Sequence, residues 1–196
     1  MKKHAKIILS ALALVGFQAY GQNLVQNGNF ATGDFTDWNL SGNVSWDSIS
    51  TYAPPGSTYA ARFGPDYPPI VMSQTVLGTT IGDDYAFSFY VYDNETSAGS
   101  GTVGDSGFEF TASIGGDEVF DSVNLPIPNW TLNSFTVLVT ASSETVQFTA
   151  VNPPGSYFVG GVSLSDEGPA TVPEPSTFGL LGAALAGLAG LRRKLA

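Results

Sequence analysis

Apolar and polar residues alternate along four segments in the middle of the chain, 84–94, 107–116, 134–141 and 145–151. A period of two, with many β-branched and aromatic residues, is typical of antiparallel strands that bury one face. The four segments are therefore predicted to be half-buried β-strands. The residues expected to face inward are Tyr85, Phe87, Phe89, Val91, Phe108, Phe110, Ala112, Ile114, Phe135, Val137, Val139, Val146, Phe148 and Ala150.

Clusters of Gly, Pro, Asn and Asp separate these segments, for example at 93–94, 115–117 and 152–155. Such clusters are typical of turns, and no stretch between 23 and 167 shows a convincing helical period. We expect about eight short strands in a domain at 22–168, which is typical of two packed sheets. The predicted fold class is all-β, a two-sheet antiparallel β-sandwich of jelly-roll type.

The first 21 residues have the three parts of a secretory signal peptide. A basic start is followed by an apolar stretch at 7–17 and by the small residues Ala19 and Gly21. This layout predicts a signal helix at 1–21 that directs export and is cleaved after Gly21.

The segment 169–196 has another three-part layout, in which an extended motif precedes fourteen uncharged residues at 178–191 and a basic end. A helix of fourteen residues spans about 21 Å, which is short of the roughly 30 Å hydrocarbon core of a bilayer. The basic end favours a cytoplasmic position, so we predict a short C-terminal transmembrane helix. The motif is Val172, Pro173, Glu174 and Pro175, and the basic stop is Arg192, Arg193 and Lys194.

The charge of the body excludes several classes of function. Between 22 and 171 the chain has sixteen acidic residues against a single cation, Arg62, so its formal charge is near −15. Such a surface repels the phosphates of nucleic acids. The chain has no Cys, and its one histidine is His4, which removes catalysis through His or Cys and the usual zinc sites. Arg62 is expected to form an ion pair with a neighbouring acid.

The C-terminal layout resembles the PEP-CTERM sorting domain. The resemblance rests on VPEP at 172–175, the apolar run and the final RRK. It implies that the inner membrane holds the chain transiently, until an exosortase-type enzyme recognises 173–175 and processes the tail. It also implies a cell that makes exopolysaccharide. A permanent tail anchor is the alternative.

The two ends of the body are similar to those of carbohydrate-binding modules with a galactose-binding-like jelly roll. The similarity rests on NLVQNGNFATGDFTDW at 23–38 and YFVGGVSLSD at 157–166. In such domains acids from the paired first and last strands help to hold a structural calcium. This chain has Ala31, Gly160 and Gly161 at those positions. Because calcium needs six to eight oxygen ligands, we expect that this site is lost and that the protein has no cofactor. A displaced site could still use Asp34, Asp37, Asp166 or Glu167.

Aromatic side chains are the candidates for contact with a sugar, because their faces stack on the apolar faces of sugar rings. Tyr90 and Tyr92 share the outward face of one predicted strand, and we place Glu109 with them as a candidate for the same sheet surface. Trp46 and Tyr67 lie in loop-rich segments, where binding sites are often built; Tyr52 and Tyr59 lie there too. Trp38 is expected in the core.

The sequence favours a non-catalytic protein of the cell surface or extracellular matrix, associated with exopolysaccharide. A carbohydrate-binding module with a defined glycan ligand is the alternative. A glycoside hydrolase is less favoured, because it needs two carboxyls about 5–9.5 Å apart. Glu109 is the only acid in the middle of a predicted strand, and it has no evident partner. We predict no catalytic and no metal-binding residues.

Overall fold

The computed structural model describes residues 21–64, 68–94, 108–123, 127–153 and 155–169. The predicted signal peptide up to residue 20, Tyr67, and the predicted transmembrane helix with its motif and basic stop lie outside these residues. Within the described ranges, no helix is long and apolar enough to span a membrane.

The described chain is built of β-strands, as predicted, with one 3-10 turn, η1. Its elements are β1 (Asn39–Ser41), η1 (Val44–Trp46), β2 (Ser48–Ser50), β3 (Ala60–Phe63), β4 (Ile70–Leu77), β5 (Asp83–Asp93), β6 (Glu109–Ile114), β7 (Asp117–Val123), β8 (Thr131–Leu138), β9 (Ser143–Val151) and β10 (Tyr157–Pro169).

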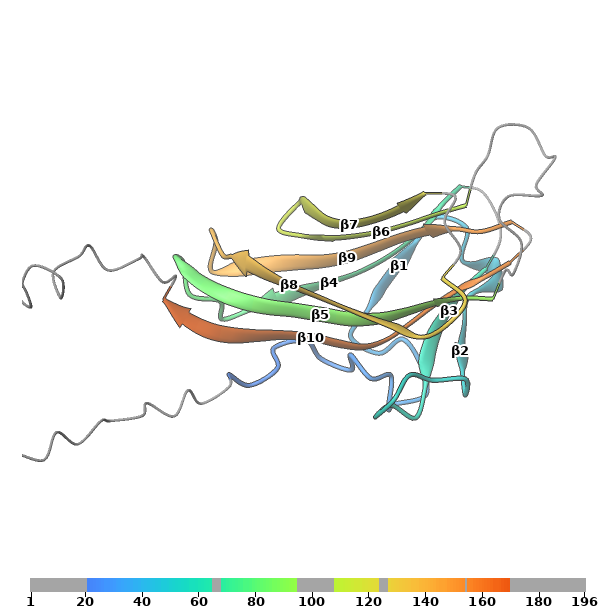
Figure 1. The fold of residues 1–196 in the computed structure, drawn as a ribbon, viewed down its shortest axis with the longest axis horizontal. Coiled ribbons are helices and arrows are strands. Elements are labelled where there is room, and N and C mark those ends of the chain that lie inside the picture. Colours follow the sequence, from blue (N-terminus) through green and yellow to red (C-terminus); the bar gives the residue numbers. More distant parts are fainter. Residues whose placement is uncertain (1–20, 65–67, 95–107, 124–126, 154, 170–196) are drawn as a thin grey trace, which may run out of the picture.

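The strands form two five-stranded sheets that stack face to face (Figure 1). The first sheet has the order β1-β4-β9-β6-β7, and the second has the order β2-β3-β10-β5-β8. All paired neighbours are antiparallel. The predicted two-sheet antiparallel sandwich is therefore confirmed.

The alternation in the sequence corresponds to the two faces of each strand. Along β5, residues 85, 87, 89 and 91 are buried and the residues between them are more exposed. The same pattern holds in β6 and β9. In β8, Phe135 and Val137 are only half-buried, because β8 lies at the edge of its sheet and the core covers them from one side only.

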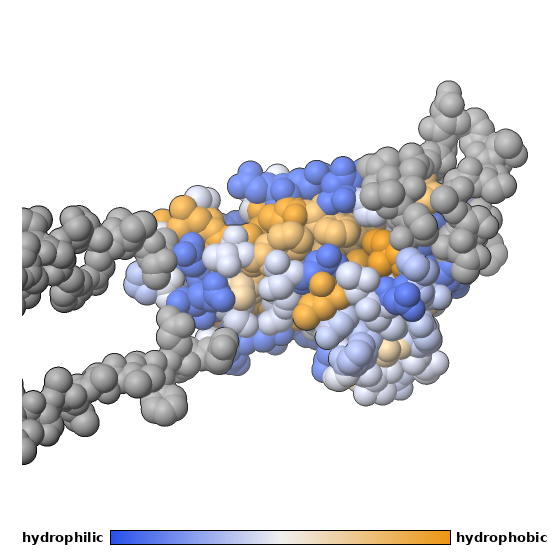
Figure 2. Space-filling model, viewed as in Figure 1, coloured by the Kyte–Doolittle hydropathy of each residue, from blue (hydrophilic) through white to orange (hydrophobic). Residues whose placement is uncertain are grey.

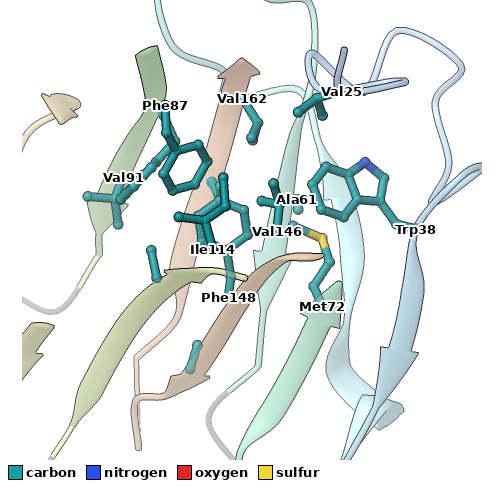
Figure 3. Packing of buried hydrophobic residues seen from close by; sticks show 14 of the residues in the cluster. Val25, Trp38, Ala61, Met72, Phe87, Val91, Ile114, Val146, Phe148 and Val162 are labelled. Atoms are coloured by element: carbon teal, nitrogen blue, oxygen red, sulfur yellow. The ribbon is translucent and has the colours of Figure 1, made fainter. Parts of the chain in front are cut away.

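Aromatic rings fill the space between the sheets (Figure 3). Phe148 lies at their centre, with its ring centroid 5.1 Å from that of Phe89, 5.9 Å from Phe110 and 6.2 Å from both Phe87 and Trp38. Trp38 is 7% exposed, which confirms its predicted place in the core.

The opening segment of the domain runs beside β10, as the resemblance to carbohydrate-binding modules implies. The amide of Leu24 donates to the carbonyl of Leu164 at 2.9 Å, and the amide of Val162 donates to the carbonyl of Gly28 at 2.9 Å. A Cβ atom at Gly28 would lie 2.2 Å from the Val162 carbonyl oxygen. Glycine is therefore required for this close approach of the two ends.

Candidate glycan-contacting surface

Tyr90 and Tyr92 both lie on the outer face of β5, as predicted, because the alternate residues Phe89 and Val91 point into the core. Their partners on β10 differ. Tyr92 lies opposite Phe158, whereas Tyr90 lies opposite Gly160. A bulky side chain beside one tyrosine and none beside the other divides the surface into two parts.

The first part is a cluster of four aromatic residues. Tyr52 comes from the β2–β3 loop, and its ring centroid lies 4.9 Å from that of Tyr92, 5.8 Å from Trp130 and 6.2 Å from Phe158. Tyr92 also lies 5.6 Å from Trp130 and 5.5 Å from Phe158. We call these four residues the aromatic cluster.

Through Tyr52, the β2–β3 loop packs against the other three residues of the aromatic cluster. Phe158 is 7% exposed, while Tyr52 is 52% exposed and presents its ring to solvent. Burial and the neighbouring Tyr52 and Asp93 raise the pKa of the Tyr92 hydroxyl. The indole nitrogen of Trp130 is buried and has no hydrogen-bond partner in the described part of the chain. Most of the cluster is thus a small second core, and only Tyr52 offers an open aromatic face.

The second part is a shallow groove of about 450 Å³ around Tyr90, which we call the Tyr90 groove. All of its lining residues are uncharged. They are Asn23, Val25, Asn27, Gly28, Asn29, Pro55, Gly56, Ser57, Tyr90, Gly161, Val162 and Ser163.

Two of the amides in the Tyr90 groove are already used by the fold. Asn23 donates to the Val162 carbonyl and accepts from two backbone amides. Asn27 donates to the carbonyls of Asp34 and Thr36. Asn29 differs, because its Oδ1 accepts from the Ala31 amide while its Nδ2 has no hydrogen bond within the described ranges. The Asn29 amide nitrogen is therefore open to a ligand.

The glycine pair at 160–161 shapes this surface. A Cβ atom at Gly160 would lie 2.9 Å from both Cγ and Cδ of Pro54 in the β2–β3 loop. Gly161 has a φ of +60°, and a Cβ atom there would lie 3.1 Å from the Tyr90 ring. The β10–β5 register shifts between Gly160 and Ser163. The glycines thus let the loop and Tyr90 pack directly against β10.

The predicted loss of a calcium site stays a prediction. Ala31 is exposed, and among the described residues no group of three or more His, Cys, Asp or Glu side chains is placed to hold a metal. Asp34 accepts hydrogen bonds from the Thr32 hydroxyl and the Thr36 amide, and these bonds lower its pKa. Asp166 accepts from the Gly168 amide.

The placement of Glu109 on the same surface as the two tyrosines was wrong. Glu109 begins β6, which belongs to the other sheet, whereas Tyr90 and Tyr92 lie on β5. Burial raises the pKa of the Tyr157 hydroxyl, and the charges of Asp93 and then of Glu109 add to that effect. Glu109 therefore lies apart from the Tyr90 groove.

The remaining candidates have different outcomes. Trp46 ends the turn η1, but its side chain, like Tyr67, lies outside the described part. Tyr59 packs against the core. Trp130 and Phe158 were not singled out from the sequence. The sequence did carry a sign of this cluster. Residues 157–159 are apolar at three consecutive positions, which indicates a strand covered on both faces.

Arg62 lies on β3 opposite Phe158, and its Nε donates to the Ser156 hydroxyl at 3.2 Å. Its charge also lowers the pKa of Asp47, but the expected ion pair of Arg62 stays a prediction. Burial nevertheless raises the pKa of Asp47 to about 6, against the lowering effects of the Gly64 amide and Arg62.

Comparisons with known proteins agree with both resemblances. Residues 171–194 match the PEP-CTERM protein-sorting motif. No curated protein matches the chain in sequence. Three solved structures resemble the body: a family 61 carbohydrate-binding module in complex with β-1,4-galactotriose, a CBM22-1 xylan-binding domain from Paenibacillus barcinonensis, and the enzymatically active domain of tailspike protein 4 from bacteriophage CBA120.

The similarity to these structures concerns the fold. The family 61 module has a TM-score of 0.54 at 18% identity over 73% of this chain and 97% of its own. The xylan-binding domain has a TM-score of 0.51 at 11% identity, over 77% of this chain and 97% of its own. The tailspike domain has a TM-score of 0.57 at 15% identity, over 74% of this chain but only 21% of its own. The chain thus carries a PEP-CTERM sorting motif at 171–194, behind a body with the jelly-roll fold of carbohydrate-binding modules.

Proposed function

We propose that this is a non-catalytic surface protein that contacts a neutral polysaccharide through the outer face of the β2-β3-β10-β5-β8 sheet. It is exported by its signal peptide and held at the inner membrane by its C-terminal helix. An exosortase-type enzyme then processes the tail, and the mature protein associates with exopolysaccharide at the cell surface or in the extracellular matrix. The sorting motif at 171–194 supports this route.

The Tyr90 groove is the observation that carries the proposal for glycan contact. It combines an aromatic ring with the open amide of Asn29 and the hydroxyl of Ser57. A sugar ring offers an apolar face and several hydroxyls, so it needs an aromatic surface and a few polar groups beside it. Besides the half-buried Tyr90, Tyr52 offers an exposed aromatic ring on the same side of the sheet.

The charge of the protein narrows the class of glycan. The body has a formal charge near −15, from sixteen acids and one arginine between 22 and 171, and no charged residue lines the Tyr90 groove. An acidic polysaccharide would be repelled by the body and would meet no cation in the groove. A neutral polymer of hexoses or pentoses fits both observations.

Affinity gel electrophoresis of the full chain in detergent, with neutral polysaccharides in the gel, tests the proposal. We expect retardation that is lost in Tyr90→Ala and kept in Gln147→Ala, a matched control on the outer face of the other sheet. Each variant should melt as the wild type does, so that lost binding is not lost folding. Equal retardation of both variants would refute a site at Tyr90.

The same gels separate the alternatives. Retardation by one polysaccharide among many would favour a carbohydrate-binding module with a defined ligand, whereas weak retardation by several would favour a matrix component. No retardation by any neutral polysaccharide would contradict glycan contact. Release of reducing sugar that disappears in Glu109→Gln would instead support a hydrolase.

A further inference from the structure

Among the described strands, the two sheets have four edges, β1, β7, β2 and β8. Three of these edge strands are protected against pairing with another chain. β1 and β2 are only three residues long. β7 carries Asp117, Glu118 and Asp121, and its register with β6 shifts between Ala112 and Ser113. Short length, charge and bulges are the ordinary means by which proteins block such edges.

The fourth edge strand, β8, has none of these protections. Its sequence TLNSFTVL contains no charged residue and no proline. It pairs with β5 along all eight residues without a register shift. Its outer face exposes Leu132 at 53% and Leu138 at 58%.

An apolar band accompanies this edge. Figure 2 shows it along the open side of the sandwich, between β7 and β8. Phe120 from β7 and Phe135 and Val137 from β8 are half-buried residues that pack against the core from this side. Covering the band would remove apolar surface from water, which favours association.

The outward-facing backbone groups of β8 can be assigned from its pairing. The Val139 amide donates to the Asp83 carbonyl, and hydrogen-bonded pairs alternate along an antiparallel ladder. The odd-numbered residues of β8 therefore bond to β5. The N–H and C=O groups of residues 132, 134, 136 and 138 point away from the sheet.

The side chains at these four positions are nearly symmetrical about Phe135, because Leu132 matches Leu138 and Ser134 matches Thr136. If a second β8 ran antiparallel with Phe135 on the two-fold axis, each leucine would face a leucine and each serine a threonine. The same register would place outward-pointing backbone groups opposite one another. The symmetry of the side chains and the positions of the outward-pointing N–H and C=O groups thus favour the same register.

We propose that β8 pairs with β8 of a second copy of this chain in that register, which joins two five-stranded sheets into one continuous sheet. The acidic bodies repel each other elsewhere, so the uncharged strand is the favoured place of contact. Glu167 of β10 lies close to this contact, because it accepts a hydrogen bond from the Thr136 hydroxyl. Because the pairing is two-fold and the other edges are protected, it closes as a dimer and not as a fibre.

Cysteine cross-linking of the full chain in detergent micelles tests the register. The natural sequence has no cysteine, so a Ser134→Cys copy and a Thr136→Cys copy each carry one thiol. The proposed pairing places these two positions about 5.5 Å apart between Cα atoms, within disulfide range. When the two variants are mixed, we expect oxidation to cross-link a Ser134→Cys copy to a Thr136→Cys copy. A sample of either variant by itself should stay largely uncross-linked. Equal cross-linking of all three samples, or none, would overturn the proposal.

A charge placed on the edge tests the contact itself, by analytical ultracentrifugation in the same micelles. Ser134→Asp should convert the dimer to a monomer, because it places an acid of each copy in the joint. Ser88→Asp is the matched control, since Ser88 lies opposite Ser134 on the same sheet face but on the interior strand β5. A monomeric wild type, or a dimer that survives Ser134→Asp, would refute the pairing.

Discussion

A methyl group at position 160 should destabilise the domain through one contact. In Gly160→Ala the new Cβ would lie 2.9 Å from Cγ and Cδ of Pro54, several tenths of an ångström inside ordinary contact. The proline ring cannot rotate away, so the β2–β3 loop must shift. Overpacking of this kind costs about 1–3 kcal/mol.

A smaller effect opposes this cost. Gly160 is not among the glycines with positive φ, so alanine fits its backbone and stabilises by about 0.4–1 kcal/mol through the unfolded state. Subtracting the two ranges leaves a net loss of about 0–2.6 kcal/mol. At the middle of that range, about 1.3 kcal/mol, the melting temperature falls by roughly 3–5 °C for a domain of this size.

A double-mutant cycle measured by thermal unfolding identifies the contact. Pro54→Ala removes the two ring carbons, so Gly160→Ala should cost nothing or even stabilise in that background. The difference between the two backgrounds is the coupling between positions 54 and 160. If Gly160→Ala were equally costly with and without Pro54, the steric explanation would be wrong.

Three further predictions concern the core, the half-buried acid Asp47 and calcium binding. Phe148→Ala should lower the free energy of unfolding by about 3–5 kcal/mol in denaturant titration, whereas Leu77→Ala, at a residue 73% exposed, should change it by less than about 0.5 kcal/mol. The folded-state pKa of Asp47, about 6, lies above its ordinary value of 3.8, so ionising it costs the folded state stability as pH rises from about 4 through 6. Asp47→Asn removes that loss, and its melting temperature relative to wild type should rise across this window and level off above it; a constant difference from pH 3 to 8 would contradict the assignment. Calorimetric titration should show no tight calcium binding, and a submicromolar site that raises the melting temperature would refute the inferred loss of calcium ligands.

Sequence alone predicted the inward faces of β5, β6 and β9 because these strands lie inside their sheets. One face of each strand packs on the aromatic core, and the other faces solvent or the covering loop. Apolar and polar residues therefore alternate along the strand. β1 and β2 were not predicted, since three residues are too few to show a period.

The misplacement of Glu109 has a different cause. Alternation tells which face of a strand a residue occupies, but it does not tell to which sheet the strand belongs. Sheet membership depends on pairing between distant segments, such as β6 with β9 and β5 with β10. The aromatic cluster was missed for the same reason, because it joins Tyr52, Tyr92, Trp130 and Phe158 across four separate segments.

The direction of β10 connects the sorting tail with the two proposed contacts. Phe158, in the aromatic cluster, lies near its start, and Pro169 at its end is opposite Asp83 and two residues before the sorting motif (Figure 1). At about 3.3 Å per residue these positions are roughly 35 Å apart. A chain held upright by its tail would therefore present the aromatic cluster away from the membrane.

Antiparallel pairing of β8 reverses the second copy, so its tail would leave from the opposite end. In the reversed copy, Pro169 would lie roughly 35 Å above the end of the body that faces the membrane. Residues 170–177 extend to about 29 Å at most. Both tails therefore cannot reach one membrane while both bodies stand upright. We therefore expect Ser134→Cys and Thr136→Cys copies to cross-link in micelles, or after the tail is processed, and much less when both are held in one membrane. Equal cross-linking in vesicles before and after removal of the tail would show that the bodies lie flat on the membrane, and would contradict the upright orientation.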